Sequence, residues 1–216
     1  MRKPEKKYVL NFAEIVIVIF IAIVFLCVFW SKSFDVRQES NVIYGWKKML
    51  GVAKYSYDVV LMAEGQTIEK IVKLPPDVRN VQILNLFAKH MDLVADKSLS
   101  RYKYRYLNGL RVSEEDEYFV DDFVYDNDKK VIIGINWINP NCFSDSNKCG
   151  IAIFDMNGKK GPNRFGLDVF GADIYNDTLL PFGSGLSYDR AAKNCAKLES
   201  GVFCSSFYLI GGQFFK

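Results

Sequence analysis

Three oxygen-bearing side chains in the segment 155–168 have types and a spacing that could hold a metal ion. Asp155, Asn157 and Asp168 offer carboxylate and amide oxygens, which calcium prefers, at a spacing similar to that of a calcium loop. Lys159 and Lys160 add positive charge between them, and no bidentate Glu follows. The Asn-Gly and Gly-Pro pairs of this segment favour the alternative, a turn-rich connection between two strands.

Residues with the chemistry of an enzyme are sparse. The sequence has neither a phosphate-binding Gly-x-x-x-x-Gly-Lys loop nor a His-Glu-x-x-His motif, and a Ser-His-Asp arrangement could use only His90. A serine between two glycines, at 183–185, follows Pro181-Phe182 in an expected surface loop. The four carboxylates at 114–117 are typical of a solvated charged turn. We therefore expect no enzyme, and neither a catalytic residue, a cofactor nor a resident metal.

The cysteines divide into one apolar filler and four candidates for disulfides. Cys27 lies in a strongly apolar stretch, where a thiol packs like a small hydrophobic side chain. The other four form an even set, which in an exported domain favours disulfides: Cys142, Cys149, Cys195 and Cys204. Four cysteines allow three pairings, and we prefer 142 with 149 and 195 with 204 because each closes a short loop. Their spacings are not those of a zinc ribbon or finger.

The stretch 10–30 is predicted to be a transmembrane helix. It has 21 residues, strongly apolar except for Glu14, and such a helix is about 31 Å long, close to the thickness of a bilayer core. The basic residues of the preceding leader, 1–9, hold that end in the cytoplasm. We expect a single-pass inner-membrane protein with a cytoplasmic N-terminus and an extracytoplasmic head.

Glu14 has two interpretations. A carboxylate near the start of a helix suits the positive end of its dipole and costs little there. Alternatively, an ionisable group inside a membrane span is costly and usually has a task.

The charge of the chain argues against a nucleic-acid partner. The whole sequence carries a formal net charge of +3. Residues 1–30 hold four basic and two acidic side chains, which leaves 24 basic and 23 acidic side chains in the rest, a net charge of about +1. No basic groove is evident, so no nucleic acid is expected as a partner.

The helical pattern continues beyond the apolar stretch. Apolar residues recur at steps of three and four over 31–65, which predicts an amphipathic continuation of the helix: Ile43, Trp46, Leu50, Ala53, Tyr57, Val60 and Leu61. Glu64-Gly65 is the predicted end of this helix, and Gly45 and Gly51 are sites for a bend. A second helix is predicted at about 78–95, with one apolar face made by Val81, Leu84, Phe87, Met91 and Val94.

Strand patterns follow from about residue 102. Alternating tyrosines before Asn108-Gly109 predict a hairpin, and a second hairpin is predicted around 126–129. The predicted strands are Tyr102–Tyr106, Tyr118–Tyr125, Val131–Asn136, Gly150–Phe154, Asp168–Tyr175 and Ser206–Ile210. The fold class is therefore α+β: a long N-terminal helix packed on the antiparallel sheet of a disulfide-bonded globular head, 66–216.

Three segments together resemble the type IV pilin and type II secretion pseudopilin family. They are the start at 10–19 with Glu14 in fifth position, the long helix to Glu64, and the segment 155–170 with Cys195 and Cys204 near the end. The resemblance implies a pilin-like fold, cleavage of the leader between Val9 and Leu10 by a prepilin peptidase, and methylation of the new N-terminus. It also implies that Glu14 pairs with the N-terminal amine of a neighbouring subunit in a filament, because a buried charge requires such a partner.

The resemblance implies a structural subunit, either a minor pilin or a pseudopilin, whose partners are the inner membrane and other pilin or pseudopilin subunits. Val9 stands where the family has Gly, and Leu10 stands where it usually has Phe. A second hypothesis is therefore a permanently membrane-anchored extracytoplasmic binding module derived from a pilin. A third, an extracytoplasmic enzyme, has no catalytic constellation to support it.

Overall fold

The computed structural model describes residues 12–94, 99, 102–126, 128, 130–145 and 147–213, with the backbone alone for residues 12–14 and 25–38 of the first helix. The chain divides into two compact units, Met1–Asn41 and Val42–Lys216. The leader 1–9, with Val9, lies outside the described residues, as does Leu10, and the side chain of Glu14 does too.

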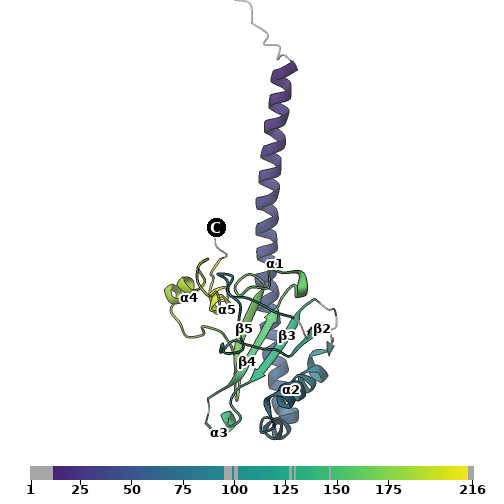
Figure 1. The fold of residues 1–216 in the computed structure, drawn as a ribbon, viewed down its shortest axis with the longest axis vertical. Helices are drawn as coiled ribbons and strands as arrows, with labels where there is room; N and C mark the ends of the chain where they lie inside the picture. The colour runs from purple at the N-terminus through teal and green to yellow at the C-terminus, as the bar shows by residue number, and fades with distance from the viewer. Residues whose placement is uncertain are drawn as a thin grey trace, which may run out of the picture. The chain divides into compact units, whose positions relative to one another are not determined.

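The long helix expected from the sequence is present as α1, Phe12–Ile71 (Figure 1). Gly45 and Gly51 keep helical backbone angles, so neither introduces a bend. The predicted end at Glu64-Gly65 coincides with a kink, because Glu64 departs from helical geometry, with φ −130° and ψ 15°, and a second helical stretch then continues to Ile71. Buried Ile68 and Ile71 explain the extra turns, since they prolong the apolar face beyond the kink.

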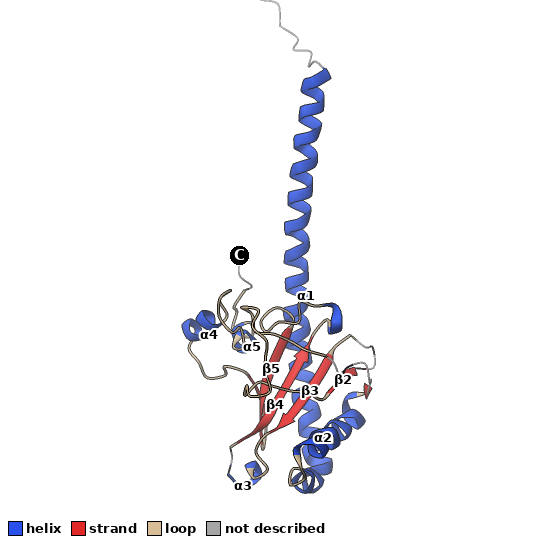
Figure 2. Ribbon diagram, in the orientation of Figure 1, coloured by secondary structure: helices blue, strands red, loops and turns tan. Residues whose placement is uncertain are grey.

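A six-stranded antiparallel sheet forms the centre of the unit Val42–Lys216, and its spatial order follows the chain (Figure 2). The α+β class with an antiparallel sheet is thus confirmed. The strands are β1 Leu93–Val94, β2 Phe123–Asp126, β3 Ile132–Trp137, β4 Lys148–Asp155, β5 Val169–Tyr175 and β6 Leu179–Pro181. Each strand pairs antiparallel with the next, so the predicted hairpin around 126–129 is the β2–β3 connection.

One face of the sheet is covered by helices, and we call it the helix face. Its core joins buried residues of α1 between Trp46 and Ile71, the helix α2 (Pro76–Met91) and alternate residues of β3, β4 and β5. Trp46 of α1 is fully buried, with its ring 5.2 Å from Phe170 and 5.6 Å from Phe154. The apolar face predicted for α1 is therefore the face that packs here.

The opposite face is covered by irregular chain, and we call it the loop face. Its core joins the other alternate residues of the strands to aromatic side chains of the segment 99–122 and the loops near 165, 182 and 202. Gly134 of β3 makes room for this layer, because a Cβ at that position would lie 2.5 Å from the Phe123 ring. The two clusters show that the sheet is buried on both faces.

Two predictions for the segment 102–109 are corrected by the structure. Tyr102–Tyr106 is not a strand, although Tyr102 and Tyr104 are buried and Lys103 between them is exposed, as alternation requires. Asn108-Gly109 makes a tight turn, with the Gly109 N–H donating to the Tyr106 carbonyl at 2.9 Å, but strands do not flank it. The segment is held instead by isolated bridges to neighbouring chain.

Ser206–Ile210, predicted as a strand, belongs to a helical segment beginning with α5, Cys204–Phe207. Residues 204–208 are all buried, so burial does not alternate along the segment as it does on a half-buried strand. Their backbone N–H and C=O groups instead form hydrogen bonds within the segment. The sequence also gave no signal for α3 (Cys142–Asp145), α4 (Tyr188–Asn194), the 3₁₀ turn η2 (Gly158–Lys160), β1 or β6.

The second helix is shorter than predicted, and its buried face differs. Leu84 and Phe87 are buried as expected, but Val81 is 44% exposed. Val94, expected on the helix, lies in β1. Polar Arg79 and Asn80 take the buried positions instead, which no apolar pattern reveals.

Candidate functional site

The first candidate assembly surface is the N-terminal part of α1. Within the unit Met1–Asn41, nine large apolar side chains of this helix are 44–67% exposed: Ile15, Val16, Ile17, Val18, Ile19, Phe20, Ile21, Ile23 and Val24. Water does not stabilise such a continuous apolar surface, which marks a site that contacts lipid or protein. Among the residues that the structure describes, no helix is both long and apolar enough to cross a membrane, so the span predicted at 10–30 is not confirmed.

A second exposed surface lies on α1 within the unit Val42–Lys216, and we call it the α1 stripe. It consists of Tyr44, Val52, Tyr55 and Met62, which are 71%, 43%, 71% and 89% exposed. Steps of seven and eleven residues return to the same side of a helix, so Tyr44, Tyr55 and Met62 share one side. The opposite side of the helix carries the buried Trp46, Leu50 and Tyr57. Exposed Lys47, Lys48 and Asp58 lie among the residues of the stripe, so the outer side of this half of α1 carries large side chains together with charged ones.

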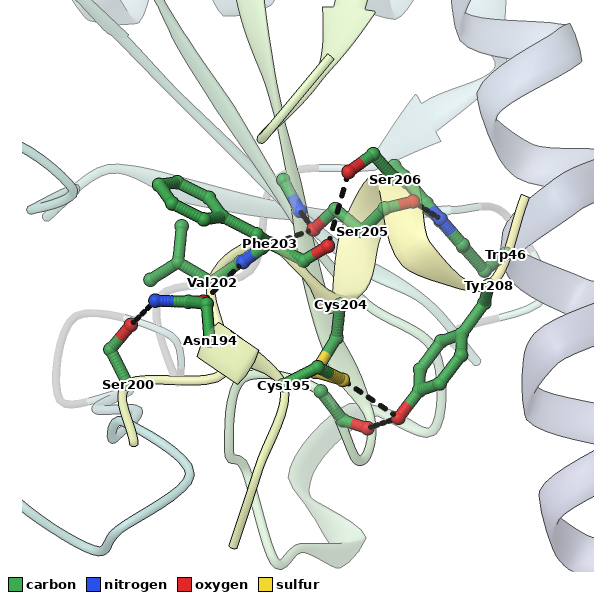
Figure 3. The surroundings of a disulfide bond; sticks show 12 residues. Trp46, Asn194, Cys195, Ser200, Val202, Phe203, Cys204, Ser205, Ser206 and Tyr208 are labelled. Atoms are coloured by element: carbon green, nitrogen blue, oxygen red, sulfur yellow. Dashed lines mark hydrogen bonds between the residues drawn. A yellow bond between two sulfur atoms is a disulfide. The ribbon is translucent and has the colours of Figure 1, made fainter. Parts of the chain in front are cut away.

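The disulfide between Cys195 and Cys204 fixes the C-terminal segment, as preferred from the sequence. Both cysteines are fully buried, and Figure 3 shows their surroundings. The Tyr208 hydroxyl lies 3.4 Å from Cys195 Sγ and donates to the Gly166 carbonyl at 2.8 Å. These contacts tie the segment after the disulfide to the loop that precedes β5.

The same segment reaches α1 and the sheet. The Trp46 Nε1–H donates to the Ser205 carbonyl at 2.8 Å, and the Gly171 N–H of β5 donates to Ser205 Oγ at 3.0 Å (Figure 3). Asn194 braces the loop by accepting from the Phe203 N–H at 2.9 Å and donating to Ser200 Oγ at 2.8 Å. The disulfide is thus a structural link between the C-terminal segment and the helix-face core.

The second disulfide joins Cys142 to Cys149, again the preferred pairing. It closes the connection from β3 to β4, where Ile138 and Asn139 N–H groups both donate to the Cys149 carbonyl, at 2.8 and 2.9 Å. Both sulfurs are buried. The paired cysteines are 7 residues apart in this disulfide and 9 residues apart in the other, so each bond closes a short loop, as predicted.

The segment 155–168 is a turn-rich connection from β4 to β5, and its carboxylates are buried. Asp155 accepts from the Tyr102 hydroxyl and, at 3.0 Å, from the Asn157 N–H. Asp168 accepts from the Asn163 and Arg164 N–H groups at 2.9 and 2.7 Å. The carboxylate oxygens therefore accept hydrogen bonds from backbone N–H groups of the same connection, and Asp155 also accepts one from Tyr102. Among the described residues, no group of three or more His, Cys, Asp or Glu side chains is placed to hold a metal ion.

Burial makes this carboxylate pair titrate abnormally. The pKa of Asp155 is raised to about 7, first by loss of solvation and then by the charge of Asp168, while hydrogen bonds from Tyr102 and backbone N–H groups oppose the shift. Burial also raises the pKa of Asp168. The pair is a source of pH-dependent stability, and its position under the segment 99–122 gives it no access to a substrate.

The remaining sequence candidates do not gather into one site. His90 is exposed near the end of α2. Glu114 and Glu115 are exposed in a turn, where Asp116 accepts from the Ser113 N–H at 2.7 Å. Ser184 is exposed and donates to the Pro181 carbonyl at 2.7 Å. Each fits the surface turn or surface position expected from the sequence.

Comparison of the chain with models of protein families, with curated proteins and with solved structures returns no match. The sequence and structure of this chain are therefore the basis for its proposed function.

Proposed function

We propose that this chain is a structural subunit, a minor pilin or pseudopilin, of a filament of the type IV pilus or type II secretion kind. The observation that carries the proposal is α1. Its residues 15–24 expose apolar side chains, and its buried residues between Trp46 and Ile71 pack on an antiparallel sheet. A helix with these two parts suits a subunit that is held in the inner membrane by residues 10–30 and later bundles with other copies.

Glu14 is the residue that we expect to pair neighbouring subunits. It is the carboxylate within the apolar stretch, and in a bundle of such helices it requires a cationic partner. Cleavage between Val9 and Leu10 would create that partner as the N-terminal amine of the next subunit. It would also remove the basic residues of the leader, which cannot enter an apolar filament core.

The α1 stripe supports the same function. Tyr44, Tyr55 and Met62 expose large side chains on the side of α1 that faces away from its buried residues. Because large exposed apolar side chains mark contact surfaces, the stripe is where we expect neighbouring subunits to pack.

The deciding experiment is the intact mass of the full chain from membranes of a host that has a prepilin peptidase. We expect a mass that begins at Leu10, with a methyl group on the new N-terminus. The matched control is Val9→Gly, which restores the family residue and reports whether the host peptidase acts on this chain. If Val9→Gly is cleaved while the native chain begins at Met1, the native chain is not processed and the filament proposal is rejected.

The second part of the test concerns assembly. In a host with the assembly machinery, Glu14→Ala is expected to abolish recovery of the chain in sheared filaments while leaving its amount in membranes unchanged. Glu69→Ala, an exposed carboxylate farther along α1, serves as the control and should leave recovery unchanged.

Val9 itself favours a second candidate function, the permanently anchored extracytoplasmic binding module. A bulky Val in place of Gly at the cleavage position would leave the leader attached. This function is supported if the native chain retains Met1 and remains wholly in the membrane fraction in the same host.

A further inference from the structure

Three arginines are placed side by side on the surface of the head by backbone pairing. Arg105 forms an antiparallel bridge with Arg111 and a parallel bridge with Arg164. The Arg105 N–H donates to the Asn163 carbonyl, and the Phe165 N–H donates to the Arg105 carbonyl, both at 2.9 Å. Bridged residues project to the same side, so the three side chains form one row, which we call the arginine row.

The turn at Asn108-Gly109 organises this row. Arg105 Nη1 donates to the Gly109 carbonyl at 3.1 Å. The guanidinium of Arg164 lies against the same glycine, because a Cβ built there would be 3.6 Å from Arg164 Nη2. Gly109 has φ +89°, a conformation that glycine adopts readily. The turn therefore places the guanidinium groups of Arg105 and Arg164 beside the same glycine.

The positive charge of the row is not neutralised within the described part of the chain. None of the three arginines forms an ion pair with a described carboxylate, and Arg164 Nε is buried without a hydrogen-bond partner. Like charges placed opposite each other destabilise a pairing. A ligand with carboxylates would relieve that repulsion, because guanidinium groups bind carboxylates through paired hydrogen bonds.

A groove runs beside the row and offers room for such a ligand. Its volume is about 710 Å³, and its lining includes Lys103, Arg105, Arg111, Glu114, Glu115 and Phe119. Lys103 Nζ lies 5.6 Å from the centre of the Phe119 ring, so an apolar surface accompanies the charge. The groove is thus lined by both cationic and anionic side chains.

The glutamates in the lining of the groove decide the class of ligand. Glu114 and Glu115 begin a run of four carboxylates, 114–117, which would repel a long polyanion such as a nucleic acid. A short protein segment can place its carboxylates on the arginines and a basic residue near the glutamates. We propose that the arginine row and its groove bind an acidic protein segment that carries two or three carboxylates next to a basic residue. This inference concerns the head alone and does not depend on the filament proposal.

The test uses the full-length protein in detergent and a fluorescent peptide with three glutamates followed by a lysine. We expect saturable binding that weakens with added salt and that falls about tenfold or more in the variant with Arg105, Arg111 and Arg164 all changed to Gln. Arg190→Gln, an exposed arginine on α4, is the matched control and should bind like the native chain.

Two further arms keep the test decisive. Arg111→Gln alone alters an exposed side chain, so it should fold normally and still weaken binding by about threefold. A single-stranded oligothymidine should bind more weakly than the peptide. The proposal is overturned if the peptide does not bind, if binding is unchanged in the arginine variants, or if the oligonucleotide binds more tightly through the same arginines.

Discussion

The two faces of the sheet are both buried, but they are covered in different ways. Helices α1 and α2 cover the helix face and satisfy most of their own backbone hydrogen bonds, so the side chains that they bury there are mainly apolar, with Ser56, Arg79 and Asn80 as the polar exceptions. Leu99 and the segment 102–122 cover the loop face without a repeating pattern of hydrogen bonds. Their backbone groups need other partners, and tyrosine hydroxyls supply them.

Tyr104 illustrates the difference. Its hydroxyl donates to the Tyr118 carbonyl at 2.5 Å and accepts from the Val120 N–H at 2.9 Å. Tyr102 likewise donates to buried Asp155. An irregular cover can therefore be as tightly buried as a helical one, provided that side chains satisfy its polar groups. This comparison predicts that the helix face is most sensitive to loss of volume and the loop face to loss of single polar atoms.

The largest effect is expected from Trp46→Ala on the helix face. The change removes a fully buried indole, its contacts with Phe154 and Phe170, and the hydrogen bond to the Ser205 carbonyl. We expect a loss of about 3–5 kcal/mol in the free energy of unfolding. Urea unfolding measures this, and Trp46→Phe should recover part of it because an aromatic ring remains.

The next largest effect is expected from removing the disulfide that links the C-terminal segment to both cores. Cys195 and Cys204 belong to the helix-face cluster, and Val202 between them belongs to the loop-face cluster. Changing both cysteines to Ser should lower the free energy of unfolding by about 2–4 kcal/mol. Thermal unfolding with and without reductant checks this, since reductant should have less effect on the variant than on the native chain.

Tyr104→Phe tests the polar cover of the loop face. The ring remains, but the Tyr118 carbonyl and the Val120 N–H lose their partner. We expect a loss of about 1–3 kcal/mol in the free energy of unfolding, because buried polar groups left unpaired are costly. Tyr44→Phe, which removes the same atom from an exposed residue of α1, should cost almost nothing, and equal losses would contradict the comparison.

The Asp155–Asp168 pair predicts a pH dependence of stability that belongs to the loop face. The pKa of Asp155 rises from 3.8 to about 7 on folding, so between these values the folded chain holds a proton that the unfolded chain has released. Stability from this group is therefore greatest at low pH and falls as pH rises through this window, by about 1 kcal/mol per pH unit. Asp155→Asn should flatten that slope in urea titrations from pH 4 to pH 7.

The smallest effect on folding is expected from Tyr55→Ala in the α1 stripe. This side chain is 71% exposed and belongs to neither core, so stability should change by no more than about 0.5 kcal/mol. Under the filament proposal the same variant should reduce recovery of the chain in sheared filaments. A large loss of stability would instead assign Tyr55 to a packed core.

Secondary structure with strong periodicity was predictable. The apolar steps from Ile43 to Leu61 predicted the buried side of α1, and the hairpin signal at 126–129 predicted the pairing of β2 with β3. The short loops between cysteines also predicted both disulfides. These features succeed because spacing alone determines which side chains share a face or can reach each other.

The buried polar residues were not predictable, because their partners lie far along the chain. Asn80 is buried because its amide donates to Asn136 Oδ1 at 3.1 Å and its oxygen accepts from the Trp137 N–H at 3.0 Å. Arg79 is buried because its guanidinium donates to the Val72 carbonyl, at 3.2 Å, just beyond the end of α1. Asn80 is therefore buried, whereas Val81, which the apolar pattern predicted to be buried, is exposed.

By itself, the sequence determined the long helix, the antiparallel α+β class and the disulfide pairing, because each depends on local periodicity or short loops. Only the tertiary structure decided what covers the second face of the sheet, how Asp155 and Asp168 are satisfied, and that three arginines form one row. Those features join segments that lie far apart in the sequence, as Arg105 and Arg164 do at a sequence separation of 59 residues, and no local pattern specifies such pairing.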